Sequence, residues 1–254
     1  MKKAWEELRL AGAFLTILPV ADKVPCDPPR LGRSMAFSTA IGLLLGLGLV
    51  LLDQVLGAIF PRPVLDALLI LSLIGVTGGL HLDGVADLAD GLAGGKDREG
   101  ILRIMKDSRV GAMGVIALVM LLLLKFLALN SVPAGQKTAA LICMPAAGRW
   151  MQVVLAFACA YARPEGGTGG AFVEHVGRRE ALFASSTLLL ALLLLFGGKG
   201  LALFLLLALA AWAAIVYFRR RLGGVTGDVL GAATERTEVF TLLLVLALFA
   251  RPGV

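Results

Sequence analysis

The feature that most constrains this chain is a series of apolar stretches long enough to cross a membrane. Of its 254 residues, 58% are hydrophobic and 17% are charged, and a mean hydropathy of +0.88 is too high for a water-soluble domain of this size. A hydrocarbon core about 30 Å thick needs roughly 20 apolar helical residues. Stretches near this length lie at residues 35–60, 64–80, 111–129, 138–161, 181–197, 201–218 and 229–250. The sequence therefore predicts an all-α, polytopic membrane bundle of about seven transmembrane helices, forming one integral-membrane domain over residues 1–254.

The basic residues predict how these helices are oriented. Most of the 24 Lys and Arg residues fall in connections on the side of the N-terminus, whereas Arg62, Lys137, Lys199 and Arg251 fall on the other side. By the positive-inside rule, we expect the N-terminal side to face the cytoplasm. The basic residues flank membrane segments without interleaved aromatic residues, so we expect no nucleic-acid partner.

The N-terminal segment, residues 5–20, resembles a signal peptide only superficially. Glu6 and Glu7 interrupt its basic start, and no cleavage site of small residues follows. We expect a retained amphipathic segment that lies on the membrane or dips into it. The sequence does not distinguish these two placements from a span.

An acidic stripe at the end of the second apolar stretch points to a function. If residues 80–91 are helical, Asp83, Asp87 and Asp90 are spaced i, i+4 and i+7 and project from one face. Three crowded carboxylates repel one another unless a cation lies between them, and oxygen ligands suit Mg²⁺. The spacing therefore predicts a divalent metal site at the cytoplasmic membrane surface, with a solvated helix face as the less favoured alternative.

Further charged residues are expected near this stripe. His81 is either a metal ligand or proton carrier, or a hydrogen-bonded structural residue. The loop at 96–109 carries Lys106 and other basic residues, a composition that suits phosphate binding. Asp228 lies at the cytoplasmic end of the last apolar stretch and is a candidate to complete the site.

Several charged residues lie deeper in the apolar stretches. Glu235 and Glu238 are in the cytoplasmic half of the last stretch, and buried charges of this kind face a bundle interior or a wet cavity. Arg149, in the fourth stretch, needs an anionic partner. An ion pair with Glu235 or Glu238 and direct contact with a substrate phosphate are equally good interpretations.

Several motifs, in the same order along the chain, resemble the cobalamin synthase family. The most specific is Gly79-Leu80-His81-Leu82-Asp83-Gly84, which continues to Gly91. The other motifs are at residues 14–20, 104–114, 148–150, 161–166 and 223–232.

The resemblance implies a multi-pass enzyme of the inner membrane, an adenosylcobinamide-GDP ribazoletransferase whose active site faces the cytoplasm. Such an enzyme joins adenosylcobinamide-GDP to α-ribazole or its 5′-phosphate, releases GMP and needs Mg²⁺. Membrane lipid is the remaining expected partner, and the sequence leaves open whether the chain forms a homo-oligomer.

The resemblance also suggests roles for individual residues. Asp83, Asp87 and Asp90 would hold Mg²⁺ on the diphosphate, and either Asp107 or Glu235 would orient or deprotonate the attacking hydroxyl. The expected catalytic residues are Asp83, Asp87, Asp107 and Glu235. The expected substrate-binding residues are His81, Lys106, Arg109, Arg149, Arg163, Asp228 and Glu238.

Two other functions are weighed against this one. A different membrane alcohol phosphotransferase would also hold metal with aspartates on neighbouring helical turns. Asp87, Asp90 and Gly91 fit the start of that group's D-x-x-D-G-x-x-A-R motif, but no Ala-Arg pair follows. An ion-coupled transporter would place polar groups across the bilayer midplane, whereas here they gather at one boundary.

Overall fold

The computed structural model describes residues 2–163, 165–167 and 169–249, and this part of the chain is largely helical. Its elements are α1 (Lys2–Leu15), α2 (Pro28–Ser34), η1 (Met35–Phe37), α3 (Ser38–Leu56), α4 (Arg62–Thr77), α5 (Leu80–Gly94), α6 (Arg98–Ile104), α7 (Ala112–Ser131), α8 (Ala134–Ala158), α9 (Gly170–His175), α10 (Arg178–Phe196), α11 (Gly198–Leu222) and α12 (Gly227–Phe249). Within these residues the one isolated β-bridge joins Tyr161 to Val225. The all-α prediction is confirmed. Pro164, Arg251 and the predicted end of the last stretch at residue 250 lie outside the described residues.

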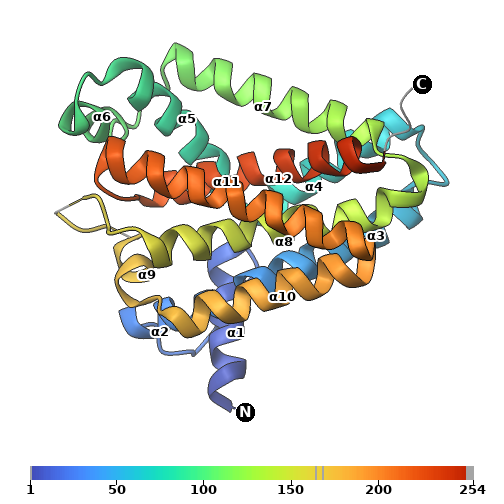
Figure 1. Cartoon of the computed structure of the whole chain (residues 1–254), viewed down its shortest axis with the longest axis horizontal. Helices are drawn as coiled ribbons and strands as arrows, with labels where there is room; N and C mark the ends of the chain where they lie inside the picture. Colours follow the sequence, from blue (N-terminus) through green and yellow to red (C-terminus); the bar gives the residue numbers. More distant parts are fainter. Residues whose placement is uncertain (1, 164, 168, 250–254) are drawn as a thin grey trace.

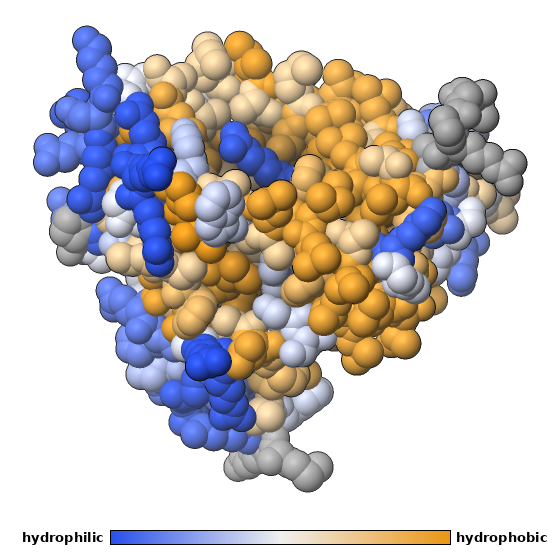
Figure 2. Space-filling view, in the orientation of Figure 1, coloured by the Kyte–Doolittle hydropathy of each residue, from blue (hydrophilic) through white to orange (hydrophobic). Residues whose placement is uncertain are grey.

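Helix α8 forms the centre of the bundle, with α3 and α12 packed most extensively against it (Figure 1). In its most apolar part, 83% of the residues are buried, compared with 22% for α7 and for α11. The outer helices therefore present apolar surface to the surroundings. Hydrophilic groups gather toward the end of the molecule where α6 lies, beside a broad hydrophobic face (Figure 2). This arrangement is that of a membrane bundle with one strongly polar end.

The predicted membrane spans are confirmed in part. Five segments are long and apolar enough to cross a membrane, namely Pro28–Leu56, α7, α8, α10 and α11. The number rises to six if α4 and α5 together form one bent span. Helix α12 matches the last predicted stretch, but Glu235, Arg236 and Glu238 interrupt its apolar character. The multi-pass architecture is thus supported, whereas the count of seven and the side of the N-terminus stay predictions.

A sharp break separates α4 from α5, whose axes meet at 92°. Gly78 and Gly79 lie between them with φ angles of 63° and 68°. Glycine adopts this left-handed conformation at little cost because it has no Cβ. The break redirects the chain so that α5 runs toward the polar end of the bundle (Figure 1), and it carries the acidic stripe there.

Helix α1 is amphipathic and crosses the direction of the main bundle helices (Figure 1). Leu10, Ala11 and Leu15 are buried, whereas Trp5 is exposed. With 14 residues, the helix is shorter than the roughly 20 residues of a span. Its length and orientation favour a segment that lies along the membrane, one of the placements expected from the sequence.

Small residues allow α3 to approach α8 closely. A Cβ added to Gly46 would lie 2.5 Å from the Cα atom of Ile142, and one added to Gly42 would lie 2.5 Å from the Cα atom of Ala146. Close contact through glycines is a common basis of helix association in membranes, where the hydrophobic effect between helices is weak. The contact between α3 and α8 therefore depends on the absence of side chains at these two positions.

We predict that Gly46→Ala destabilises the protein, because the new methyl group collides with the α8 backbone. Overpacking of this kind costs about 1–3 kcal/mol. Gly48 lies on the same helix, and a Cβ there meets nothing within 4 Å, so Gly48→Ala is the matched control and should be neutral or slightly stabilising. Thermal unfolding of the purified variants in detergent measures the difference. Equal melting temperatures would contradict the close contact.

Candidate active site

The acidic stripe of α5 faces the start of α12. Two glycines make this possible, because a Cβ on Gly84 would lie 2.4 Å from the carbonyl oxygen of Asp228, and one on Gly231 would lie 3.2 Å from the Cα atom of His81. Asp83 and Asp228 are close enough to influence each other electrostatically. The close packing thus brings an aspartate from the last helix to the stripe, as the sequence suggested for Asp228.

A cavity of about 330 Å³ lies at this junction. Its polar lining comes from α5, α8 and α12, and consists of His81, Asp83, Gln152 and Asp228. Phe14 and Phe172 are part of its apolar lining, and their rings pack together with a centroid distance of 4.2 Å. We call this space the acidic cavity, because its charged lining residues are both aspartates.

The single β-bridge holds Arg163 beside Asp228. The backbone N–H of Val225 donates to Ala160 O over 2.9 Å, and that of Ala162 donates to Val225 O over 2.8 Å. This pairing ties the segment after α8 to the segment before α12. The Nη2 atom of Arg163 then donates to the Asp228 carboxylate over 2.6 Å. Two segments more than 60 residues apart in sequence are thereby joined at the site.

A second cavity, of about 450 Å³, lies on the other side of Arg163. Arg103, Lys106 and Arg163 supply its cations, and Glu99 and Glu165 supply its acids. Lys106 donates to Glu165 over 2.7 Å in an exposed ion pair, which contributes little to stability because water screens it. We call this space the basic cavity. Arg103 and Lys106 are exposed and available to an anion at little cost, as expected for phosphate binding, whereas Arg163 is also engaged with Asp228.

Asp90 is engaged differently from its two neighbours on the stripe. One carboxylate oxygen accepts the backbone N–H of Gly111 over 2.7 Å, and the other accepts that of Gly114 over 2.8 Å. These are N–H groups of the first turn of α7, which have no partner within their own helix. Asp90 therefore caps α7, and both of its oxygens are in use.

Asp107 and Arg109 pair with each other, and neither lines the two cavities. Arg109 Nη2 lies 2.7 Å from the Asp107 carboxylate. Hydrogen bonds from the Arg109 side chain and backbone lower the pKa of Asp107 to about 2. A carboxylate with so low a pKa is a weak proton acceptor at neutral pH. The structure thus gives Asp107 no contact that fits the predicted role of base.

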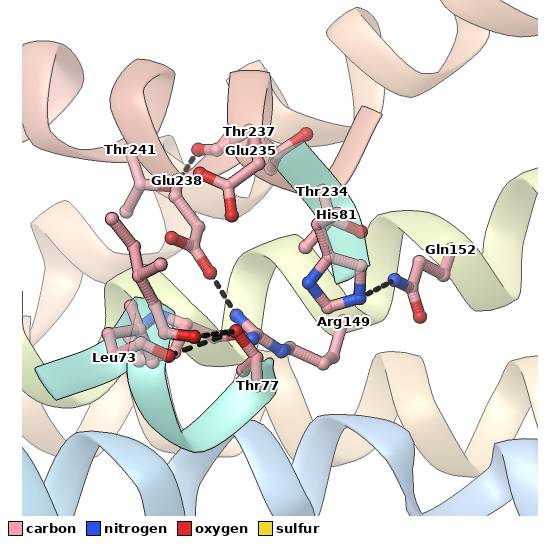
Figure 3. Close-up of polar contacts among 12 residues, drawn as sticks. Leu73, Thr77, His81, Arg149, Gln152, Thr234, Glu235, Thr237, Glu238 and Thr241 are labelled. Atoms are coloured by element: carbon pink, nitrogen blue, oxygen red, sulfur yellow. Dashed lines mark hydrogen bonds and ion pairs between the residues drawn. The ribbon is translucent and has the colours of Figure 1, made fainter. Parts of the chain in front are cut away.

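Glu235, Glu238 and Arg149 belong to a buried ionic cluster. Glu238 pairs with both Arg149 and Lys125, and Lys125 also lies 2.8 Å from Glu235. Figure 3 shows the Glu238 carboxylate directed toward the Arg149 guanidinium. Two acids and two bases balance one another across α7, α8 and α12. Of the two interpretations of Arg149, the structure matches the ion pair, and it places the cluster apart from the lining of the acidic cavity.

His81 contacts a residue that the sequence analysis did not single out. The amide nitrogen of Gln152 lies 2.8 Å from Nε2 of His81 (Figure 3). An amide N–H donates, so Nε2 accepts and Nδ1 carries the proton. Gln152 follows Arg149 by three residues on an apolar helix, and a polar residue at that position is the signal by which the sequence analysis could have found it.

The donor chemistry of the acidic cavity suits Mg²⁺. Among the described residues, no group of three or more His, Cys, Asp or Glu side chains is arranged to hold a metal ion. Mg²⁺, however, is commonly held by one or two carboxylates, with water and substrate phosphates completing its shell. Asp83 and Asp87 lie within electrostatic range of each other and of Asp228. Asp83 lines the acidic cavity, whereas Asp87 lines neither cavity. The set of ligands stays a prediction, and both oxygens of Asp90 already accept backbone N–H groups.

Comparison with known proteins gives consistent results along the chain. Residues 7–246 match the family described as "Cobalamin-5-phosphate synthase". A protein of Geotalea daltonii named "Adenosylcobinamide-GDP ribazoletransferase" is 41% identical over 238 residues, which cover 94% of this chain and 96% of the relative. Proteins with the same name are 40% identical in Desulforamulus reducens, covering 95% and 96%, and 41% identical in Pseudomonas paraeruginosa, covering 98% and 100%. No solved structure matches the chain.

We predict that Asp90→Ala destabilises the protein because the first turn of α7 loses its cap. Loss of a capping side chain typically costs about 0.5–2 kcal/mol. Asp83→Ala removes the same group two turns earlier on the same helix, from an exposed position without a capping contact, and is the matched control. Thermal unfolding in detergent should show a lower melting temperature only for Asp90→Ala. The capping role is wrong if both variants unfold alike.

We also predict that Lys125→Met is strongly destabilising, since it leaves two buried glutamates with one cation. Breaking a buried pair costs about 3–5 kcal/mol. The double variant Lys125→Met/Glu235→Gln removes one charge of each sign and should recover part of that loss. Unfolding of both variants, compared with the exposed replacement Arg179→Gln, provides the measurement. A double variant no more stable than Lys125→Met alone would argue against charge balance in the cluster.

Proposed function

The chain belongs to the cobalamin-5-phosphate synthase family, and from this membership we propose its reaction. It transfers the adenosylcobinamide phosphate group of adenosylcobinamide-GDP to α-ribazole, or to α-ribazole 5′-phosphate, and releases GMP. Support comes from relatives that bear the name of this activity and align with almost the whole chain at about 40% identity. The reaction is the last step of nucleotide-loop assembly in cobalamin synthesis.

The observation that carries the proposal is the pairing of two cavities of opposite charge at Arg163. A diphosphate substrate brings several negative charges, which the cations of the basic cavity can neutralise. The acidic cavity next to it offers carboxylates to a metal ion or to a hydroxyl group. Phosphoryl transfer depends mainly on positioning and charge neutralisation, and the two cavities provide both functions side by side.

We assign the metal ligands to Asp83 and Asp87, with Mg²⁺ as the ion. When bound, Mg²⁺ would neutralise charge on the diphosphate oxygens and polarise the phosphorus under attack. Asp90 supports the site indirectly, because its bonds to Gly111 and Gly114 hold α7 against α5. Lys106 and Arg163, together with Arg103, would bind the diphosphate of the substrate and the single phosphate that leaves on GMP.

The transfer forms one bond and breaks another. A hydroxyl oxygen of the α-ribazole ribose bonds to the phosphorus that carries cobinamide, and the P–O bond to GMP breaks, with the bridging oxygen leaving on GMP. The hydroxyl proton must go to a base. Asp228 lines the acidic cavity and is a better placed acceptor than Asp107, which is paired at the surface, or Glu235, which is paired in the bundle interior.

His81 and Gln152 would orient the substrate at the same cavity. Both are polar groups among apolar walls, and Nδ1 of His81 has no hydrogen-bond partner among the described residues. A buried polar atom without a partner is costly, so a substrate group that accepts its N–H would be bound in a defined position. We therefore propose His81 as a substrate-binding residue.

We place the active site on the cytoplasmic side of the inner membrane. The cavities lie among the loops that carry most of the basic residues, and such loops face the cytoplasm in multi-pass proteins. Nucleotide substrates are available on that side. The N-terminus would face the same compartment.

The proposal predicts Mg²⁺-dependent release of GMP by the purified protein in detergent or liposomes, supplied with adenosylcobinamide-GDP and α-ribazole. Asp83→Asn should reduce turnover by at least 100-fold, since loss of an electrostatic contact to the reacting groups typically costs this much. Asp22→Asn, at an exposed aspartate that lines neither cavity, should retain full activity.

Thermal unfolding of the same samples shows whether Asp83→Asn is folded. Full turnover in this variant removes Asp83 from the site. Turnover that persists in excess EDTA contradicts the metal requirement. Absence of GMP release from the wild-type protein in Mg²⁺, with the protein folded, contradicts the reaction itself.

A further inference from the structure

An apolar groove runs along the outside of the bundle between α7 and α11, with α12 as its floor. Its volume is about 400 Å³, within the range of small-molecule binding sites. Its lining is mainly apolar and includes leucines of α7, alanines of α11 and aromatic residues of α11 and α12. Figure 2 shows hydrophilic atoms inside the hollow, surrounded by hydrophobic surface. Acyl chains of the surrounding bilayer would fill a wholly apolar groove without any polar contact. The hydrophilic atoms in this groove therefore need a separate explanation.

Among the residues that the structure describes, Arg236 is the one charged residue that lines this groove. It is exposed, and within the described residues its guanidinium makes no hydrogen bond or ion pair. The acids nearest to it in sequence are not available as partners. Glu235 is paired with Lys125, and Glu238 is paired with Lys125 and Arg149, on the buried side of α12.

The groove therefore carries an unbalanced positive charge beside an apolar surface. The buried cluster contains two acids and two bases, so it leaves no negative charge for Arg236. An intramembrane arginine normally finds an anionic partner or reaches a polar boundary. Arg236 lies nine residues beyond the start of α12, about 14 Å along the helix at 1.5 Å per residue. It thus stands between the polar end of the molecule and the deeper apolar part of the groove.

We propose that this groove is a binding site for an anionic phospholipid. The phosphate binds Arg236, and an acyl chain occupies the deeper part of the groove, where Leu124, Ala210 and Leu243 line it. Lipid is the occupant that supplies both a phosphate and a hydrocarbon chain to a surface that faces the membrane. Arginine suits a phosphate because its planar fork donates two parallel hydrogen bonds.

The site is separate from the two cavities of the proposed reaction. Arg236 lines neither of them, and the proposal does not depend on the identity of the substrate. The lipid would fill the space between α7 and α11. It would then contact both helices, which without lipid are linked through their packing against α12.

Lipid binding to the intact, delipidated protein in a neutral detergent tests the proposal. Native mass spectrometry with dioleoyl phosphatidylglycerol as the probe should show one lipid bound more tightly than the rest. Arg236→Gln should weaken that first binding step at least tenfold. Arg179→Gln makes the same change in charge at an exposed position of α10 and should leave it unchanged. Arg236→Lys, which keeps the charge but not the fork, should give an intermediate affinity.

A second variant tests the apolar half of the site without touching the charge. Ala214 lines the groove from α11 and is half-buried, so Ala214→Phe should fill the space for the chain and also weaken binding at least tenfold. Inorganic phosphate and glycerol 3-phosphate at millimolar concentration should not displace the lipid. Melting temperatures measured without lipid show that each variant is folded.

Three results would overturn the proposal. The first is an equal loss of lipid binding in Arg236→Gln and Arg179→Gln, which would indicate general surface charge. The second is displacement of the lipid by free phosphate, which would indicate an anion site without a role for the chain. The third is a change from dimer to monomer in Arg236→Gln with lipid binding intact, which would indicate that a second copy of the chain covers the groove.

Discussion

The structure depends on the way α12 is held in the middle of the bundle. A helix with Glu235 and Glu238 in its first half is not stable among apolar neighbours unless the charges are matched. Lys125 of α7 and Arg149 of α8 match them from two sides. Removing four charges from water is expensive, so the cluster is better understood as fixing one arrangement of three helices than as a large source of stability. With α12 fixed, its first turn and Asp228 are fixed as well.

The site follows from two local features of the backbone. Gly78 and Gly79 break the chain between α4 and α5, which allows α5 to bring its aspartates alongside α12. The bridge between Tyr161 and Val225 then draws the loop after α8 to the beginning of α12. Neither feature involves a group that would act on a substrate. Both set the positions of the groups to which we assign that role.

The sequence predicts the parts of this structure that the membrane itself dictates. Apolar length identifies α3, α7, α8, α10 and α11, because a bilayer demands roughly 20 such residues whatever the rest of the fold. The i, i+4, i+7 spacing likewise places the three aspartates on one helix face, since that is a local property.

The contacts of each carboxylate, by comparison, depend on residues far away in the sequence. Asp90 meets N–H groups 21 and 24 residues away, and the choice of partner for Arg149 requires the packing of α8 against α12. The contact between Gln152 and His81 also depends on helix packing, so the sequence alone does not identify Gln152 as the partner of His81.

Arg163 lines the basic cavity and donates to Asp228, which lines the acidic cavity, and it has a single guanidinium group. The carboxylate of Asp228 and an incoming phosphate draw on the same set of N–H donors. A phosphate that accepts some of these N–H groups would weaken the hydrogen bonding between Arg163 and Asp228. Conversely, strong hydrogen bonding between Arg163 and Asp228 would weaken phosphate binding. By thermodynamic linkage, ligand binding in the basic cavity and ligand binding in the acidic cavity are not independent. If the substrates bind as proposed, this one side chain makes the first reactant alter the affinity of the cavity that receives the second.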